Sequence, residues 1–135
     1  MNKEEGLILI PKIEKYIEYI LNIILKIPRT EKFNIGNEYK ISIYEILKNV
    51  IYINKVSNKL EYLNKIDAEL LLQRIYLRIM LKNRWIDEKK FKTSIEYIHE
   101  IGKIIGGLIK YYAKNNKKWI LLLMSIQKCT IFQIY

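Results

Sequence analysis

The fold is decided by one long helical stretch, residues 59–85, which has the sequence KLEYLNKIDAELLLQRIYLRIMLKNRW. Its apolar residues recur at intervals of three and four, which is the spacing of an α-helix. Two such series are present: Leu60, Leu63, Ile66, Leu70 and Leu77 in one, and Leu71, Ile75, Ile79 and, one residue beyond the stretch, Ile86 in the other. A helix with two apolar faces is either central in the fold or in contact with a second subunit.

Three further helical segments flank this one in the sequence. Residues 12–27 place Ile13, Ile17, Ile20, Ile24 and Ile27 on one face, and residues 37–57 do so with Tyr39, Ile43, Ile46, Val50 and Ile53. Residues 88–114 hold a heptad of Phe91, Ile95, Ile98, Gly102, Ile105, Ile109 and Tyr112. Four helices with short connections predict an all-α, antiparallel, up-down-up-down four-helix bundle over residues 1–114.

Single residues mark the predicted helix boundaries. Pro11 lies near the start of the first helix, where a missing N–H is tolerated. Pro28 ends that helix, because the residue before a proline is disfavoured in the helical region. Asn34 or Asn37 can cap the second helix, and Asp87 can cap the fourth.

The first connection has the sequence IPRTEKFNIG, residues 27–36. Pro28 closes one helix and Gly36 lets the chain enter the next, so that Phe33 and Ile35 are expected to cover the end of the bundle. Arg29 is expected to reach carbonyls, carboxylates or a neighbouring subunit. We predict a mainly structural role for this segment, because aromatic loop residues usually pack.

The C-terminal extension, residues 115–135, differs in composition from the bundle. After the polar NNKK it continues as WILLLMSIQKCTIFQIY. From sequence it can extend the fourth helix, pack across the bundle or pair as a strand. Its longest apolar run, residues 119–126, is far shorter than the ~20 residues that a membrane-spanning helix needs.

The charge of the chain limits the kinds of partner. Lys and Arg number 24 against 14 acidic residues, for a net charge of +10. Such an excess favours nucleic acid, an anionic membrane surface or an acidic protein as partner. The single cysteine, Cys129, cannot form an intrachain disulfide, and no signal peptide is expected, so we predict a cytoplasmic protein without a membrane segment.

Candidate catalytic and metal sites are poorly supported by the sequence. His99 is the only histidine, and although Glu96 precedes it at the i, i+3 spacing of a di-metal bundle, no second such motif exists. Gly102, Gly106 and Gly107 lie inside a helix and not in a phosphate-binding loop. We expect them to admit a side chain from a facing helix or a second subunit. We therefore predict no catalytic residue, no metal and no cofactor.

The basic residues are the better candidates for a functional site. Only four of them are arginines, Arg29, Arg74, Arg78 and Arg84, which suggests positions where a planar guanidinium matters. Arg74, Arg78 and Lys82 form a ridge that suits a phosphate backbone, or that pairs between subunits with acids such as Glu69. Lys114, Lys117 and Lys118 form a second cluster. Lys89, Lys90 and Lys92 oppose the dipole of the fourth helix, a small cost that anion binding would offset.

Two of these segments resemble the Avd family, the accessory variability determinants of diversity-generating retroelements. IPRTEKFNIG is similar to the family's Pro-Arg-Ser/Thr loop, carried here by Pro28, Arg29, Phe33 and Gly36. IHEIGKIIGGLIK, residues 98–110, is similar to its helix-four signature with Gly102, Gly106 and Gly107. Residues 59–85 match its third helix, with Arg74, Arg78 and Arg84 at positions that are commonly basic. The resemblance covers roughly residues 10–114 and extends to the four-helix superfamily of ribosomal RNA intervening-sequence proteins.

The resemblance implies a non-enzymatic protein that assembles as a homopentameric barrel. It further implies association with the reverse transcriptase of the retroelement and binding of RNA or DNA during mutagenic retrohoming. The nucleic-acid-binding residues would then be Arg74, Arg78, Lys82, Arg84, Lys114, Lys117 and Lys118. An alternative is an oligomeric scaffold of the intervening-sequence type with a protein partner. Residues 115–135 extend beyond the usual end of the family and inherit no role.

Overall fold

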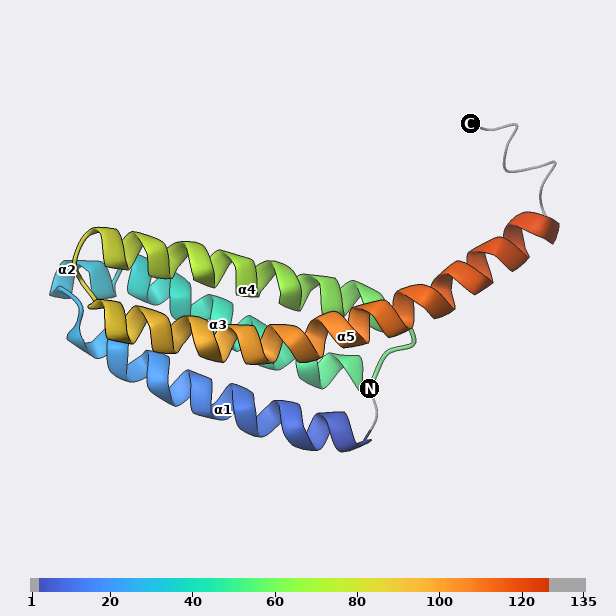
Figure 1. Cartoon of the computed structure of the whole chain (residues 1–135), viewed down its shortest axis with the longest axis horizontal. Helices are drawn as coiled ribbons and strands as arrows, with labels where there is room; N and C mark the ends of the chain where they lie inside the picture. The colour runs from blue at the N-terminus through green and yellow to red at the C-terminus, as the bar shows by residue number, and fades with distance from the viewer. Residues whose placement is uncertain (1–2, 127–135) are drawn as a thin grey trace.

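The computed structural model confirms an all-α bundle. It describes the backbone of residues 3–126 and the side chains of residues 8–115. Four long helices are present in this range, α1 (Lys3–Lys26), α3 (Ile35–Ile53), α4 (Lys59–Lys82) and α5 (Glu88–Ile126), and the single-turn α2 (Arg29–Lys32) lies in the first connection. The long helices alternate in direction, and α5 continues beyond the end of the bundle that is opposite α2 (Figure 1).

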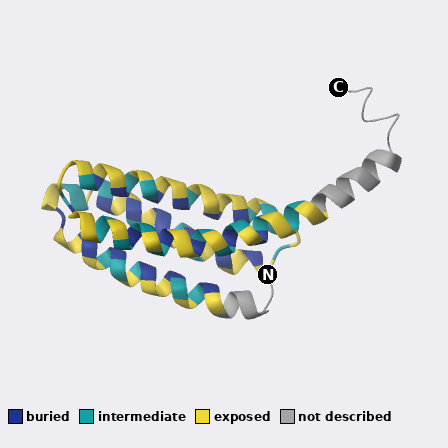
Figure 2. Ribbon diagram, in the orientation of Figure 1, coloured by how far each residue is buried: buried dark blue, intermediate teal, exposed yellow. Residues whose placement is uncertain are grey.

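The helices form a closed ring of packing contacts. α3 packs on α4, α4 on α5, α5 on α1, and α1 on α3. Buried positions face the interior on all four long helices (Figure 2). The five spaced residues of α3, Tyr39, Ile43, Ile46, Val50 and Ile53, are all buried, as are Leu63, Ile66, Leu70 and Leu77 of α4. Burial of each such side chain contributes about 1.5–3 kcal/mol, so the bundle is held by the periodic residues.

Helix α1 begins at Lys3, earlier than the predicted residue 12, and contains Pro11. Pro11 is exposed, and its missing N–H removes one backbone hydrogen bond of the helix. Leu9, in the turn before Pro11, has 0% exposure. Its burial favours continuation of the helix through the proline.

The other ends differ from the predicted ranges by a few residues, with one exception. α3 starts at Ile35 and ends at Ile53, and α4 ends at Lys82. The exception is α5, which runs to Ile126, so residues 115–126 extend the fourth helix. Residues 127–135 lie outside the described part of the chain. None of the helices described is long and apolar enough to cross a membrane.

Asp87 caps α5 as predicted. Its Oδ1 accepts a 2.7 Å hydrogen bond from the backbone N–H of Lys90. Asn34 occupies the N-cap position of α3 without capping it, because its side-chain Nδ2 donates instead to the Thr30 carbonyl at 3.2 Å.

Candidate nucleic-acid interface

Helix α4 carries the predicted basic ridge, defined by Arg74, Arg78 and Lys82 on successive turns. Arg78 and Lys82 are exposed and Arg74 is half-buried. The helical rise gives the ridge a length of about 12 Å. None of the three forms a salt bridge with a described residue. The cations of Arg78 and Lys82 are therefore open to an anionic partner.

Arg74 lies in a different environment, against α5. Its Nη2 is 3.6 Å from the position that a Cβ on Gly102 would occupy, so a side chain of a facing helix lies at Gly102 as predicted, although at this distance an alanine would fit as well. Beside Arg74 is a hollow of about 470 Å³ that Ile95, Glu96, His99 and Glu100 also line. Because these carboxylates lie nearby, Arg74 is a weaker candidate for phosphate than Arg78 or Lys82.

The other two glycines of α5 have no such neighbour. No described atom lies within 4 Å of a Cβ built on Gly106 or on Gly107. Gly107 borders a hollow of about 440 Å³ together with Ile8, Leu108 and Tyr111. The prediction of a facing helix is wrong for these two positions, since α1 and α5 leave the space open. Contact with a second subunit stays a prediction.

The second apolar face of α4 is exposed. We define the α4 apolar stripe as Leu71, Leu72, Ile75 and Ile79, whose exposed fractions range from 36% to 52%. Ile86 was expected on this face but is buried at 5% exposure, because α4 ends at Lys82 and the chain turns inward. The stripe lies on the same helix as the basic ridge, so one helix presents both an apolar and a cationic surface.

The loop residues of the family motif have different environments from those predicted. Gly36 is buried inside α3, where a Cβ would lie 3.0 Å from Ile24 Cγ2 and 3.3 Å from the Glu31 carbonyl. Ile35 packs against the core, but Phe33 is 75% exposed, so the prediction that Phe33 covers the bundle end is wrong. The tight approach of α3 to α1 and α2 at Gly36 leaves the Phe33 ring outside.

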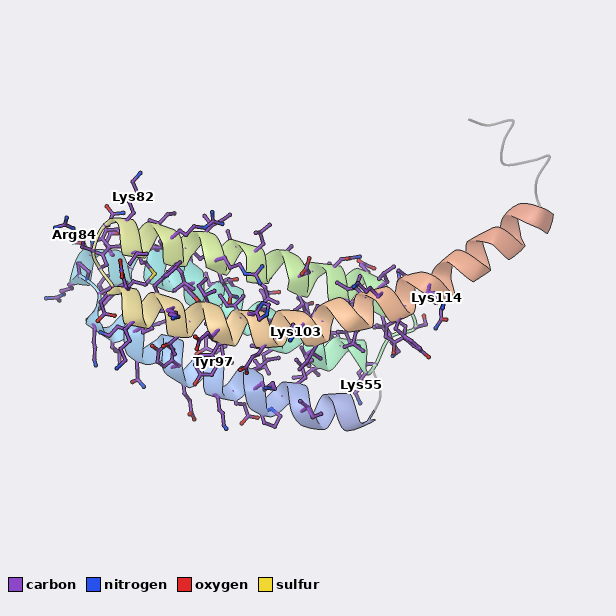
Figure 3. The ribbon with its side chains drawn as sticks, viewed as in Figure 1. Lys55, Lys82, Arg84, Tyr97, Lys103 and Lys114 are labelled. Atoms are coloured by element: carbon purple, nitrogen blue, oxygen red, sulfur yellow. The ribbon has the colours of Figure 1, made fainter. Side chains whose placement is uncertain are left out.

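The remaining motif and basic residues lie on the surface. Pro28 and Arg29 are exposed, and Pro28 is the N-cap of α2. Arg84 is exposed in the turn between α4 and α5, Lys89 and Lys92 are exposed, and Lys90 is half-buried. Lys114 is exposed near the point where α5 leaves the bundle (Figure 3). The side chains of Lys117 and Lys118 lie outside the described residues.

Sequence reasoning missed a polar network inside the bundle. Tyr16 and Tyr39 share a 2.6 Å hydrogen bond, and the Tyr16 hydroxyl donates to Gln73 Oε1 at 2.6 Å. Gln73 Nε2 donates to Ser42 Oγ at 2.8 Å, and Ser42 donates to Glu69 Oε2 at 2.5 Å. The helical spacing could have indicated this network, because it puts Ser42 and Gln73 on the core faces of α3 and α4. The network joins three helices, so it fixes their mutual register.

Arg74 also acts on this network. Burial raises the pKa of Tyr16 well above its usual range, the neighbouring Tyr39 raises it further, and the positive charge of Arg74 acts in the opposite direction. Burial likewise raises the pKa of Tyr39. Both phenols are therefore neutral hydrogen-bonding groups at physiological pH.

These features define a class, a small basic four-helix bundle with cations and exposed apolar residues on one helix. Residues 7–112 match the model of the bAvd-like family, and the chain belongs to this family. The match confirms the resemblance to the Avd family, and the matched residues include the loop and helix-four motifs. A search of curated proteins finds no match.

A solved structure supports the fold. It is a protein of unknown function from the S23 ribosomal protein family of Bacteroides thetaiotaomicron, with a TM-score of 0.71 and 16% sequence identity. The alignment covers 78% of this chain and 98% of that one. At this identity the likeness establishes the four-helix architecture and does not extend to function.

Proposed function

We propose that this protein is a non-enzymatic, cytoplasmic accessory protein of a diversity-generating retroelement. It binds the template RNA or its DNA copy, together with the reverse transcriptase of the same element, in mutagenic retrohoming. Membership of the bAvd-like family supports the accessory role. The observation that carries nucleic-acid binding is the pair of exposed cations Arg78 and Lys82, which form no salt bridge with any described residue, in a chain of net charge +10.

The test measures binding of a fluorescent structured RNA by anisotropy, with the full chain, over a range of salt concentrations. The ridge variant is Arg78→Glu with Lys82→Glu. A matched control is Lys48→Glu with Lys65→Glu, which changes the net charge equally at two exposed lysines that pair with Glu45 and Glu61. We expect the ridge variant to lose about tenfold or more in affinity, because phosphate contacts dominate such binding.

The control should change affinity by about threefold or less, since it alters only the overall field. Equal losses in the ridge variant and the control would show that binding depends on total charge and not on the ridge. Absence of binding by the unmodified chain at low salt would contradict nucleic-acid binding altogether.

The α4 apolar stripe favours self-association as part of the same function. Leu71, Leu72, Ile75 and Ile79 form a row on one helix, and an exposed apolar row of this kind is typical of an interface. The resemblance to Avd makes a homopentamer the expected assembly. Light scattering of the unmodified chain and of Ile75→Lys tests this: the variant should be monomeric. A monomeric unmodified chain would contradict it.

Binding to a reverse transcriptase is tested separately, by co-purification with any reverse transcriptase encoded beside this gene. A genome that holds such an enzyme and paired near-repeats differing at adenines would support the retroelement assignment. An oligomer that binds neither nucleic acid nor reverse transcriptase would favour the alternative, a scaffold with another protein partner.

A further inference from the structure

One end of the bundle presents a cationic surface with an exposed aromatic ring. The connection between α1 and α3 and the turn between α4 and α5 both lie at this end (Figure 1). We define the α2-end surface by seven residues: Arg29, Lys32, Phe33, Lys82, Arg84, Lys89 and Lys90. Figure 3 shows the Lys82 and Arg84 side chains directed outward there.

Phe33 is the first unexplained feature of this surface. At 75% exposure it is more exposed than any other large hydrophobic residue in the described part of the chain. An exposed ring contributes little to the stability of the fold. By contrast Ile35, two residues later, packs on the core. A ring exposed on a short, hydrogen-bonded turn is available to stack on a planar partner.

Arg84 is the second unexplained feature of this surface. Its φ of 60° is the one positive φ at a non-glycine residue in the described chain. Trp85 N–H donates to the Met80 carbonyl at 2.9 Å and Arg84 N–H to the Leu81 carbonyl at 3.0 Å. This is the Schellman pattern, and Arg84 holds the position that glycine normally occupies. An arginine in a position that glycine normally occupies points to a use for its side chain.

The charges at this end favour an anionic partner. Besides the six cations, the two turns carry three acids, Glu31, Asp87 and Glu88, and Asp87 is engaged in capping α5. None of the six cations forms a salt bridge with a residue that the structure describes. Two of the four arginines of the chain, Arg29 and Arg84, lie here. A hollow of about 460 Å³, bordered by Arg84, Trp85 and Lys90 with Asp87 and Glu88, adjoins the turn.

We propose that the α2-end surface binds unpaired nucleotides, with Phe33 stacked on a base and Arg84 in contact with the phosphate backbone. The proposal rests on the nucleic-acid binding proposed above and adds a surface that shares only Lys82 with the basic ridge on α4 and that prefers single strands. Stacking on a protein ring requires a base that is not already stacked in a duplex, so the exposed phenylalanine selects for single strands.

The first test compares Phe33→Ala with the full unmodified chain. The probes are a fluorescent 12-nucleotide oligouridine and a blunt-ended RNA duplex without unpaired nucleotides, at low salt. We expect Phe33→Ala to weaken binding of oligouridine by about tenfold, the effect of losing one stacked base, and to leave the duplex within about twofold. Phe33→Trp, which keeps an aromatic ring at this position, should bind oligouridine about as tightly as the unmodified chain. The control is Tyr44→Ala, which removes an exposed aromatic ring from α3, away from the α2-end surface. It should change neither the affinity for oligouridine nor the affinity for the duplex.

An unchanged affinity of Phe33→Ala for oligouridine would overturn the proposal while leaving the ridge on α4 as the binding site. If the unmodified chain bound neither probe, the proposed function would fail with it. A change in oligomer mass of Phe33→Ala by light scattering would show that the ring contacts a second copy instead, and would also overturn the proposal.

The second test uses Arg84→Gly, which gives the turn the residue that its backbone favours. We expect this variant to unfold at higher urea concentration than the unmodified chain and yet to bind oligouridine several-fold more weakly. The slope of log affinity against log salt should fall by about one, because one phosphate contact is lost. A more stable variant with unchanged affinity and salt slope would remove Arg84 from the site.

Discussion

The Tyr16 hydroxyl on α1 donates a 2.6 Å hydrogen bond to Gln73 Oε1 on α4, which lies across the bundle from α1. Both side chains are buried, with exposures of 1% and 0%. The Tyr39 hydroxyl on α3 forms a second hydrogen bond with the Tyr16 hydroxyl. In the described part of the chain no buried side-chain nitrogen or oxygen lacks a partner, so this network is fully satisfied.

Removal of one member should therefore destabilise the fold. Tyr16→Phe leaves Gln73 Oε1 and the Tyr39 hydroxyl without this partner in the interior, which costs about 2 kcal/mol. Urea unfolding followed by circular dichroism measures the loss. Tyr44→Phe is the matched control, because Tyr44 is 42% exposed and should change stability by less than about 0.5 kcal/mol. Equal stabilities of the two variants would contradict a stabilising network.

The same tyrosines predict a loss of stability at alkaline pH. Burial raises the pKa of Tyr16 and of Tyr39 in the folded state, whereas an unfolded tyrosine ionises near pH 10. The folded chain therefore binds more protons than the unfolded chain above pH 10. The free energy of unfolding is therefore at its full value below pH 10. Above pH 10 it falls by about 1.4 kcal/mol per pH unit for each of the two buried tyrosines.

Urea unfolding at pH 8, 10 and 11 measures this decline, and absorbance at 295 nm follows ionisation. The two buried tyrosines should ionise only as the chain unfolds. A variant with phenylalanine at both positions should show a shallower decline. Equal stability at pH 10 and pH 11 in the unmodified chain would contradict the prediction.

Two glycine substitutions should have opposite effects. Gly36→Ala places a Cβ at 3.0 Å from Ile24 Cγ2 and 3.3 Å from a backbone carbonyl, so we expect a loss of about 1–2 kcal/mol from overpacking. Gly106→Ala meets no described atom within 4 Å and should gain up to about 1 kcal/mol from helix propensity. Thermal unfolding of the two variants shows whether each one is less or more stable than the unmodified chain. If Gly106→Ala also weakens self-association, a second copy packs at that position.

Asp87→Ala should destabilise α5 at its start. The variant loses the 2.7 Å hydrogen bond to the Lys90 N–H and the acidic group at the helix N-terminus, which together cost about 1 kcal/mol. Asp87→Asn should recover most of this stability, because the asparagine side chain also caps. A stability of Asp87→Ala equal to that of the unmodified chain in urea would show that the cap is not needed.

Much of the architecture could be predicted from local spacing. The five apolar residues predicted to share one face of α3 are buried, Pro28 separates α1 from α2, and Asp87 caps α5. The two apolar faces of α4 were visible as two series of residues. The candidate site was predicted less well: Arg78 and Lys82 are exposed cations, but Arg74 is half-buried against α5.

The sequence alone determined the existence and order of the four long helices, the apolar face of each, and membership of the bAvd-like family, whereas the start of α1 and the length of α5 came from the structure. The properties that the sequence determined depend on residues a few positions apart. Only the tertiary structure decided that Phe33 stays exposed, that Arg74 lies over Gly102, and that Tyr16 meets Gln73. Each of these depends on how closely helices distant in sequence approach one another, and side-chain packing across the bundle sets that distance.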